Sequence, residues 1–156
     1  MKSSLPMNPR VAGFTLMEVM NTVAILSILA AVALPNYFDY VTRSKIVEAK
    51  TNLADMRTRL EQYFLDNRSF PTGCVPAAAG PAPATKIYLP ASNKFFDVTC
   101  ALTATTYTVT ASGNGTGGMA GFVYTVNEAN TRATTSTGSW GKSSTVCWIG
   151  RKNGDC

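Results

Sequence analysis

The chain contains an apolar stretch of helix length that carries a single charge. Between Phe14 and Phe38 every residue is uncharged except Glu18. About 20 apolar residues are enough to cross the hydrocarbon core of a membrane. Insertion of an ionised side chain at the bilayer centre costs about 2.5 to 3.5 kcal/mol, so such residues are rare in membrane helices and are usually paired with a partner. The pattern therefore predicts a membrane-spanning helix with a functional carboxylate near its start.

The stretch that follows is amphipathic. Its apolar residues recur at steps of three and four, which predicts one buried helix face: Ile46, Ala49, Leu53, Met56, Leu60 and Phe64. Its charged residues mostly occupy the other face: Arg43, Lys45, Glu48, Lys50, Asp55, Arg57, Arg59 and Glu61. We therefore expect one helix from about Thr15 to about Asn67. Pro35 should bend this helix where the apolar half meets the amphipathic half, because it lacks an N–H and clashes with the preceding turn.

After the helix the pattern changes to that of strands. Pro71 and Gly73 end the helical region, and a Pro/Ala-rich connector runs over 75–85. Alternating apolar residues then predict strands over 96–100, 107–109, 122–126 and 132–136, with a shorter candidate over 146–149. Ala104 and Thr105 should form the turn between the first two. The expected fold class is α+β, a long N-terminal helix packed on a C-terminal antiparallel β-sheet.

Composition narrows the function classes. The chain has 156 residues, a formal net charge of +5 and no histidine. Without histidine it lacks the commonest general base and the commonest metal ligand. No constellation of nucleophile, base and orienting group stands out either, so we expect neither an enzyme nor a bound cofactor.

Four cysteines follow the apolar stretch: Cys74, Cys100, Cys147 and Cys156. An even number of cysteines outside the cytoplasm indicates two disulfides, with three possible pairings. A zinc site is the alternative. It is disfavoured because the sequence has no CxxC pair and no histidine.

The N-terminal region resembles that of a bacterial type IV prepilin. The resemblance lies in the short basic leader, in Gly13 before Phe14, in the run Phe-Thr-Leu-Met-Glu and in Pro35 after the apolar stretch. It implies that a prepilin peptidase cuts between Gly13 and Phe14 and N-methylates Phe14. It also implies that Glu18 pairs with the N-terminal amine of an adjacent subunit during assembly. Pilins close their C-terminal region with a disulfide, which favours Cys147–Cys156 and leaves Cys74–Cys100 as the second pair.

The resemblance implies a type IV pilin fold with three parts: a cleaved leader (1–13), a transmembrane and filament-core helix (14–38) and a soluble head (39–156). The expected protein is a minor pilin that crosses the inner membrane once, with its head in the periplasm, and then enters an extracellular pilus for adhesion, twitching motility or DNA uptake. Its expected partners are other pilin subunits, the inner membrane, the inner-membrane assembly platform and the peptidase. Asn21, Thr22 and Ser27 depart from the residues usual in the family.

Other interpretations stay open. Lys2, Arg10 and the Ala31-Val32-Ala33 triplet also suit a secretory signal peptide, and the length suits a plain membrane anchor. A pseudopilin of type II secretion is a further alternative, although Asp155 alone makes a poor calcium site. A DNA-binding or host-surface-binding pilin is another, because cations and aromatic rings gather near the C-terminus and could neutralise phosphates and stack on bases: Trp140, Lys142, Trp148, Arg151 and Lys152.

Overall fold

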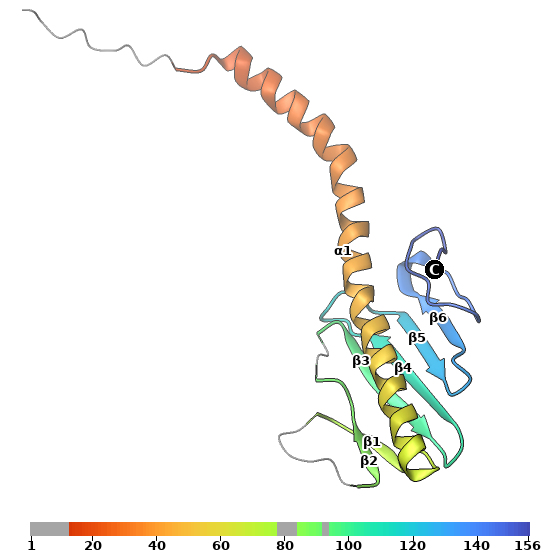
Figure 1. Cartoon of the computed structure of the whole chain (residues 1–156). Helices are drawn as coiled ribbons and strands as arrows, with labels where there is room; N and C mark the ends of the chain where they lie inside the picture. The colour runs from red at the N-terminus through yellow and green to blue at the C-terminus, as the bar shows by residue number, and fades with distance from the viewer. Residues whose placement is uncertain (1–12, 78–83, 92–93) are drawn as a thin grey trace, which may run out of the picture. The chain divides into compact units, whose positions relative to one another are not determined.

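The computed structural model describes residues 13–77, 84–91 and 94–156, and Figure 1 shows its elements. The chain forms two compact units, divided between Phe38 and Asp39. One helix, α1, runs over Leu16–Asn67 through both. The other elements lie in the second unit: β1 (Gly73–Val75), β2 (Lys86–Tyr88), β3 (Phe96–Leu102), β4 (Tyr107–Gly113), β5 (Phe122–Asn127), β6 (Arg132–Thr137) and the 3-10 helix η1 (Gly138–Trp140). The expected leader lies outside the described residues, apart from Gly13.

Helix α1 has the predicted bounds to within one residue at its start. It is continuous through Pro35, where the expected bend remains a prediction. At its C-terminal end Arg68 adopts a left-handed conformation with φ of 59°. Its N–H donates to the carbonyl oxygen of Phe64 at 2.7 Å, so this residue caps the helix where glycine is more usual.

The second unit is built around a four-stranded antiparallel sheet in the order β3-β4-β5-β6. All four strands were predicted, and so was the turn between β3 and β4, where Thr103 N–H donates to Thr106 O at 2.9 Å. Figure 1 shows the lower part of α1 lying against this sheet. Helix and sheet share one core of buried side chains, which confirms the α+β class: Ile46, Ala49, Leu53, Met56, Leu60, Phe96, Val98, Tyr107, Val109, Phe122, Tyr124 and Val126.

Polar contacts fix the helix to the sheet at one corner. Glu48 Oε1 accepts the backbone N–H groups of Phe95 and Phe96 at 2.9 and 3.2 Å. Lys45 Nζ donates to Gly117 O at 2.9 Å. Glu48 therefore satisfies two backbone donors at the start of β3, and the helix charges are not all solvent-facing.

Two parts of the second unit differ from the prediction. β1 and β2 form a small parallel pair at the two ends of the expected connector, where no strand was predicted, and the Cys74–Cys100 disulfide joins β1 to β3. Residues 146–149 are not a strand. Ser144 bridges to the edge strand at Thr134, and the residues after it are held by side-chain contacts instead of a ladder.

Candidate processing site and basic surface

The start of α1 is capped by the side chain of Thr15, the residue that precedes the helix. Glu18 N–H donates to Thr15 Oγ1 at 3.2 Å and to Thr15 O at 3.1 Å. Thr15 and Glu18 stand at the Thr-x-x-Glu spacing of a capping box, and this spacing is the sequence signal from which the role of Thr15 could have been predicted. A carboxylate in the first turn also interacts favourably with the helix dipole, by about 0.3 to 1 kcal/mol. Glu18 therefore has a local structural role in addition to any role in assembly.

The expected cleavage junction adjoins this capped end. Phe14, Glu18, Val19 and Thr22 line a shallow hollow of about 280 Å³. Phe14 is 81% exposed, and Gly13 has open space where a side chain would project. An amine created at Phe14 would therefore lie about one helical turn from Glu18. No described residue is a hydrogen-bond or ion-pair partner of the Glu18 carboxylate.

Between this junction and Phe38 the helix surface is apolar and exposed. Its large exposed side chains are Leu16, Met17, Val19, Met20, Val23, Ile25, Leu26, Ile28, Leu29, Val32, Leu34, Tyr37 and Phe38. The hydroxyls of Thr22 and Ser27 each donate to a carbonyl of the same helix, at 2.8 Å. These two unusual residues therefore need no polar partner from outside. By length and composition α1 could cross a membrane.

The second candidate site is the C-terminal loop, closed by the Cys147–Cys156 disulfide. This pairing and Cys74–Cys100 are the same pairs that the resemblance implied. Thr134 Oγ1 donates to Cys147 O at 2.8 Å and accepts from Ile149 N–H at 2.9 Å. Tyr124 Oη donates to Ile149 O at 3.1 Å. The loop is thus fixed to the buried face of the sheet.

Trp148 is part of this anchor. It is 8% exposed, and its indole N–H donates to Thr125 O at 2.7 Å. The Arg132 guanidinium lies over its ring, 4.9 Å from the ring centre. A base cannot stack on a ring that is covered in this way, so the structure contradicts Trp148 as a surface binding residue. Trp140 is half-buried and packs edge-on against Phe122 at 5.3 Å.

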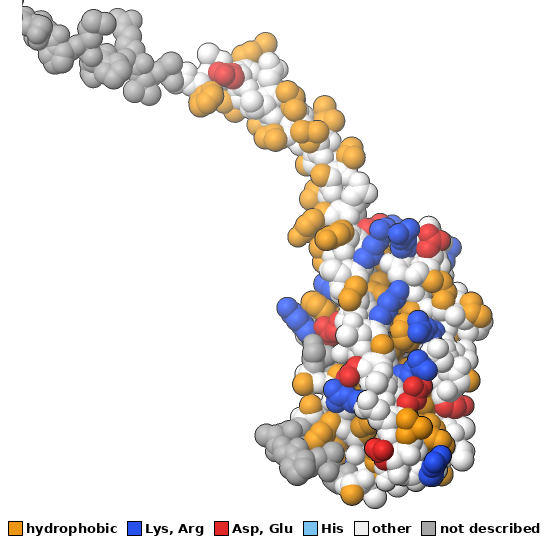
Figure 2. All heavy atoms as spheres, viewed as in Figure 1, with side chains coloured by type: hydrophobic (Ala, Val, Ile, Leu, Met, Phe, Trp, Pro, Cys, Tyr) orange, Lys and Arg blue, Asp and Glu red, His pale blue; other side chains and the backbone are white. Residues whose placement is uncertain are grey.

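The predicted cations surround the loop. Lys142, Arg151 and Lys152 are all exposed. Arg151 has a distant ion pair with Asp155 at 3.7 Å, and the described residues offer no acid to Lys142 or Lys152. Figure 2 shows Lys and Arg side chains spread over the visible face of the head.

Two further cations come from distant parts of the sequence. Arg132, at the start of β6, is exposed above Trp148. Lys50 of α1 lies beside the loop, since a methyl group on Gly150 would come within 2.9 Å of its Nζ. Burial lowers the pKa of Lys50. Sequence reasoning missed both residues because only the fold brings helix, strand and loop together.

Acidic and cysteine side chains are scattered over the head. Within the described residues no group of three or more of them is placed to hold a metal ion. The expectation of a protein without a metal or cofactor stays a prediction.

Two family models match the chain. The model described as "Type IV minor pilin ComP, DNA uptake sequence receptor" matches residues 35–121, more than half of the chain. The model described as "Prokaryotic N-terminal methylation motif" matches residues 8–34. The C-terminal loop lies outside both matches.

Curated relatives match part of the chain. The chain is 53% identical over 57 residues to the type IV major pilin protein PilA of Myxococcus xanthus, which covers 36% of this chain and 26% of PilA. It is 40% identical over 76 residues to the type IV major pilin protein PilE1 of Neisseria gonorrhoeae, covering 49% and 36%. The matches thus span well under half the length of these relatives.

Solved structures of pilins also align with the chain. A minor pilin, PilV of Neisseria meningitidis, aligns with a TM-score of 0.47 and 22% identity, covering 65% of this chain and 93% of PilV. A type IV pilin from Shewanella oneidensis aligns with a TM-score of 0.43 and 11% identity, covering 58% and 89%. The family model matches residues 35–121, and the methylation motif matches the residues before them. The chain therefore belongs to the type IV pilin family, in the group described as minor pilin ComP.

Proposed function

We propose that this chain is a minor pilin, a subunit that is processed at the inner membrane and assembled into a type IV pilus. The observation that carries the proposal is the methylation motif over residues 8–34, followed by an exposed apolar helix with a capped start. The matched relatives are pilus subunits, so we infer a structural role without catalysis or cofactor. The pilin match also favours a pilus subunit over a secretion pseudopilin.

In this proposal the peptidase cuts between Gly13 and Phe14 and methylates Phe14. The helix over 14–38 then holds the chain in the inner membrane, with the head over 39–156 in the periplasm, until the assembly platform moves it into the filament. There the exposed apolar side chains exchange lipid for neighbouring helices. Glu18 sets the register, because its charge is tolerable in an apolar filament core only when the Phe14 amine of a neighbour pairs with it.

Variants of Gly13 test the processing step. Gly13 has open space around it, so a side chain there should not disturb the fold. We expect Gly13→Leu to block cleavage and to retain the full-length chain in the membrane, whereas Gly13→Ala is cut at least in part. The readout is the mass of the chain in membranes that contain the peptidase. Cleavage of Gly13→Leu at the usual position would contradict the proposed junction.

We also propose that the basic surface of the C-terminal loop binds DNA. The description of the matching family as a DNA uptake sequence receptor supports DNA binding, although its match ends at residue 121. The location at the loop is supported by the cations that gather there: Lys50, Arg132, Lys142, Arg151 and Lys152. Since Trp148 is buried, the cations should act mainly on phosphates, and binding should weaken steeply with salt.

A titration of labelled duplex DNA against the full chain in detergent, at two salt concentrations, tests this second role. The variant Lys142→Glu/Arg151→Glu/Lys152→Glu should weaken binding and flatten the salt dependence, by roughly one unit of log-log slope for each phosphate that the variant no longer neutralises. Lys86→Glu is the matched control, because Lys86 is exposed on β2 and is not among the residues placed around the loop. Absence of binding at low salt would end the receptor proposal and leave the pilus role standing.

A further inference from the structure

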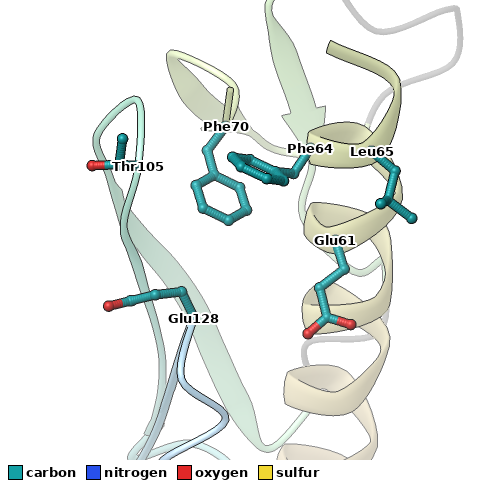
Figure 3. A pocket seen from close by; sticks show the side chains of 6 residues that line it. All are labelled: Glu61, Phe64, Leu65, Phe70, Thr105 and Glu128. Carbon is teal, nitrogen blue, oxygen red and sulfur yellow. The ribbon is translucent and has the colours of Figure 1, made fainter. Parts of the chain in front are cut away.

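The head contains a pocket that neither proposed role uses. Glu61, Phe64, Leu65, Phe70, Thr105 and Glu128 line a space of about 410 Å³ next to the last turns of α1. Figure 3 shows Glu61 on the helix side and Glu128 on the opposite side, with the rings of Phe64 and Phe70 between them. The pocket therefore combines two carboxylates with an aromatic wall.

This lining suits a cation on an apolar stem. Phe64 and Phe70 pack with ring centres 4.8 Å apart, and Phe70 packs edge-on against Tyr107 at 5.0 Å, so the wall is held in place. Glu61 is balanced by Arg57 at 2.7 Å. Glu128 accepts the Tyr107 backbone N–H at 3.2 Å but has no ion pair with any described residue. An arginine or lysine side chain could place its stem on the rings and its charge beside Glu128.

The same head presents a side chain of this kind. Tyr40, Arg43, Ser44 and Val47 line a second hollow, of about 340 Å³, on α1. Tyr40 and Val47 are 72% and 59% exposed, and Arg43 has no ion pair with a described residue. This Arg43 patch, a cation flanked by an aromatic and an aliphatic side chain, complements the pocket in charge and in polarity. The two surfaces lie roughly 27 Å apart along α1, at about 1.5 Å per residue, so they cannot meet within one chain.

We propose that the pocket receives Arg43 from a second copy of this chain. The inference rests on the proposed function, because assembly into a filament is what brings two heads together. The two surfaces differ and lie at different levels of the same helix, so the contact is heterologous and needs only two copies of this chain side by side in a filament, not a filament built of this chain alone. Copies joined in this way would be displaced by roughly 27 Å along the direction of α1.

Photo-crosslinking tests the contact directly. Leu65 lines the pocket and is 68% exposed, so p-benzoylphenylalanine at this position should be tolerated. In filaments that contain isotopically distinct copies of the chain, we expect crosslinks from position 65 of one copy to residues 40–47 of another. Crosslinks that map elsewhere, to lipid or to a different protein would overturn the proposal.

Charge reversal supplies the second measurement. Arg43→Glu and Glu128→Arg should each lower this crosslink about five-fold, and the double variant should recover to within about two-fold of the parent. Asp66→Arg is the control, because Asp66 is exposed near the end of α1 and does not line the pocket. Absence of rescue with the head still folded overturns the contact. A chain missing from filaments altogether contradicts the proposed function instead, so the two failures are distinguishable.

Discussion

The two compact units place similar apolar side chains in opposite environments, although one helix runs through both. Leu26, in the unit up to Phe38, is 63% exposed, whereas Leu53, in the head, is fully buried. The head therefore covers its own apolar surface, while the first unit needs lipid or other helices to cover it. In the proposed role the chain lies first in a membrane and then in a filament, and the first unit is the part that exchanges one apolar surrounding for the other.

One glutamate from each unit, Glu18 and Glu48, shows the same difference between contacts within the chain and exposure to possible partners. Glu48 in the head accepts two backbone N–H groups of the same chain. The Glu18 carboxylate has no such partner among the described residues, although its backbone takes part in the cap at Thr15. The Glu48 carboxylate is therefore used within the fold, whereas the Glu18 carboxylate remains available to a partner from another chain.

The largest expected effect comes from truncating the same residue type in each unit. Leu53→Ala should destabilise the head by about 2 to 5 kcal/mol, because it leaves a cavity in a packed core. Leu26→Ala should leave unfolding of the head unchanged. Thermal unfolding of the full chain in detergent, followed by circular dichroism, measures both. Equal effects would show that the two units are not energetically separate.

Removing the C-terminal disulfide should have the next largest effect. The variant Cys147→Ser/Cys156→Ser should lose about 2 to 3 kcal/mol of stability, because the unfolded head is no longer constrained by a closed loop. Denaturant unfolding under oxidising conditions measures the change. The first unit, up to Phe38, should retain its helix because neither cysteine belongs to it. A loss of helix there would contradict the division of the chain into two independent units.

Glu18→Gln removes the charge of Glu18 and keeps the cap at Thr15. The cap uses the backbone N–H of Glu18 and not its side chain, so the helix start should survive in this variant. The glutamine side chain carries no charge for a neighbour's amine. We expect leader cleavage to continue while the amount of chain in sheared filaments falls about ten-fold, which corresponds to about 1.4 kcal/mol. Thr15→Ala removes the cap and keeps the charge, so it serves as the matched control. Incorporation of Glu18→Gln at the parent level would refute the pairing role.

The smallest expected effect is a pH dependence at Lys50. Burial lowers its pKa from the ordinary value of 10.5, so in the window just below that value the unfolded chain holds more protons than the folded one. Stability should therefore rise with pH through this window, and Lys50→Met should remove the rise. Because burial raises the pKa of Tyr107 and Tyr124, their contribution to stability falls at the upper end of the same range. The difference between parent and variant in denaturant unfolding isolates Lys50.

The sequence predicted the elements whose side chains follow a simple period. The three- and four-residue steps of α1 and the alternation in β3 to β6 are local patterns, because each element buries one face. β1 and β2 escaped prediction because each has three residues and they pair across a connector. The strand expected over 146–149 was wrong because Trp148 and Ile149 are buried by side-chain contacts with β5 and β6 and not by a ladder.

The candidate sites also differ in whether a local sequence pattern or only the fold indicates them. The junction at Gly13 and Phe14 and the acid at Glu18 are adjacent in sequence, so the motif alone could indicate them. The basic surface needed the fold, since Lys50 and Arg132 meet the C-terminal loop from separate elements. The burial of Trp148 also depends on tertiary packing, and composition alone cannot distinguish a buried indole from an exposed one.

The most direct test of the proposed pilus role is the intact mass and N-terminal peptide map of the chain recovered from sheared surface material. We expect a chain that begins at a methylated Phe14, because the apolar unit is processed and then covered by neighbouring subunits in a filament. A chain that begins at Leu34 or nearby would contradict this role, because the apolar unit would then have been removed as a signal peptide and could not enter a filament.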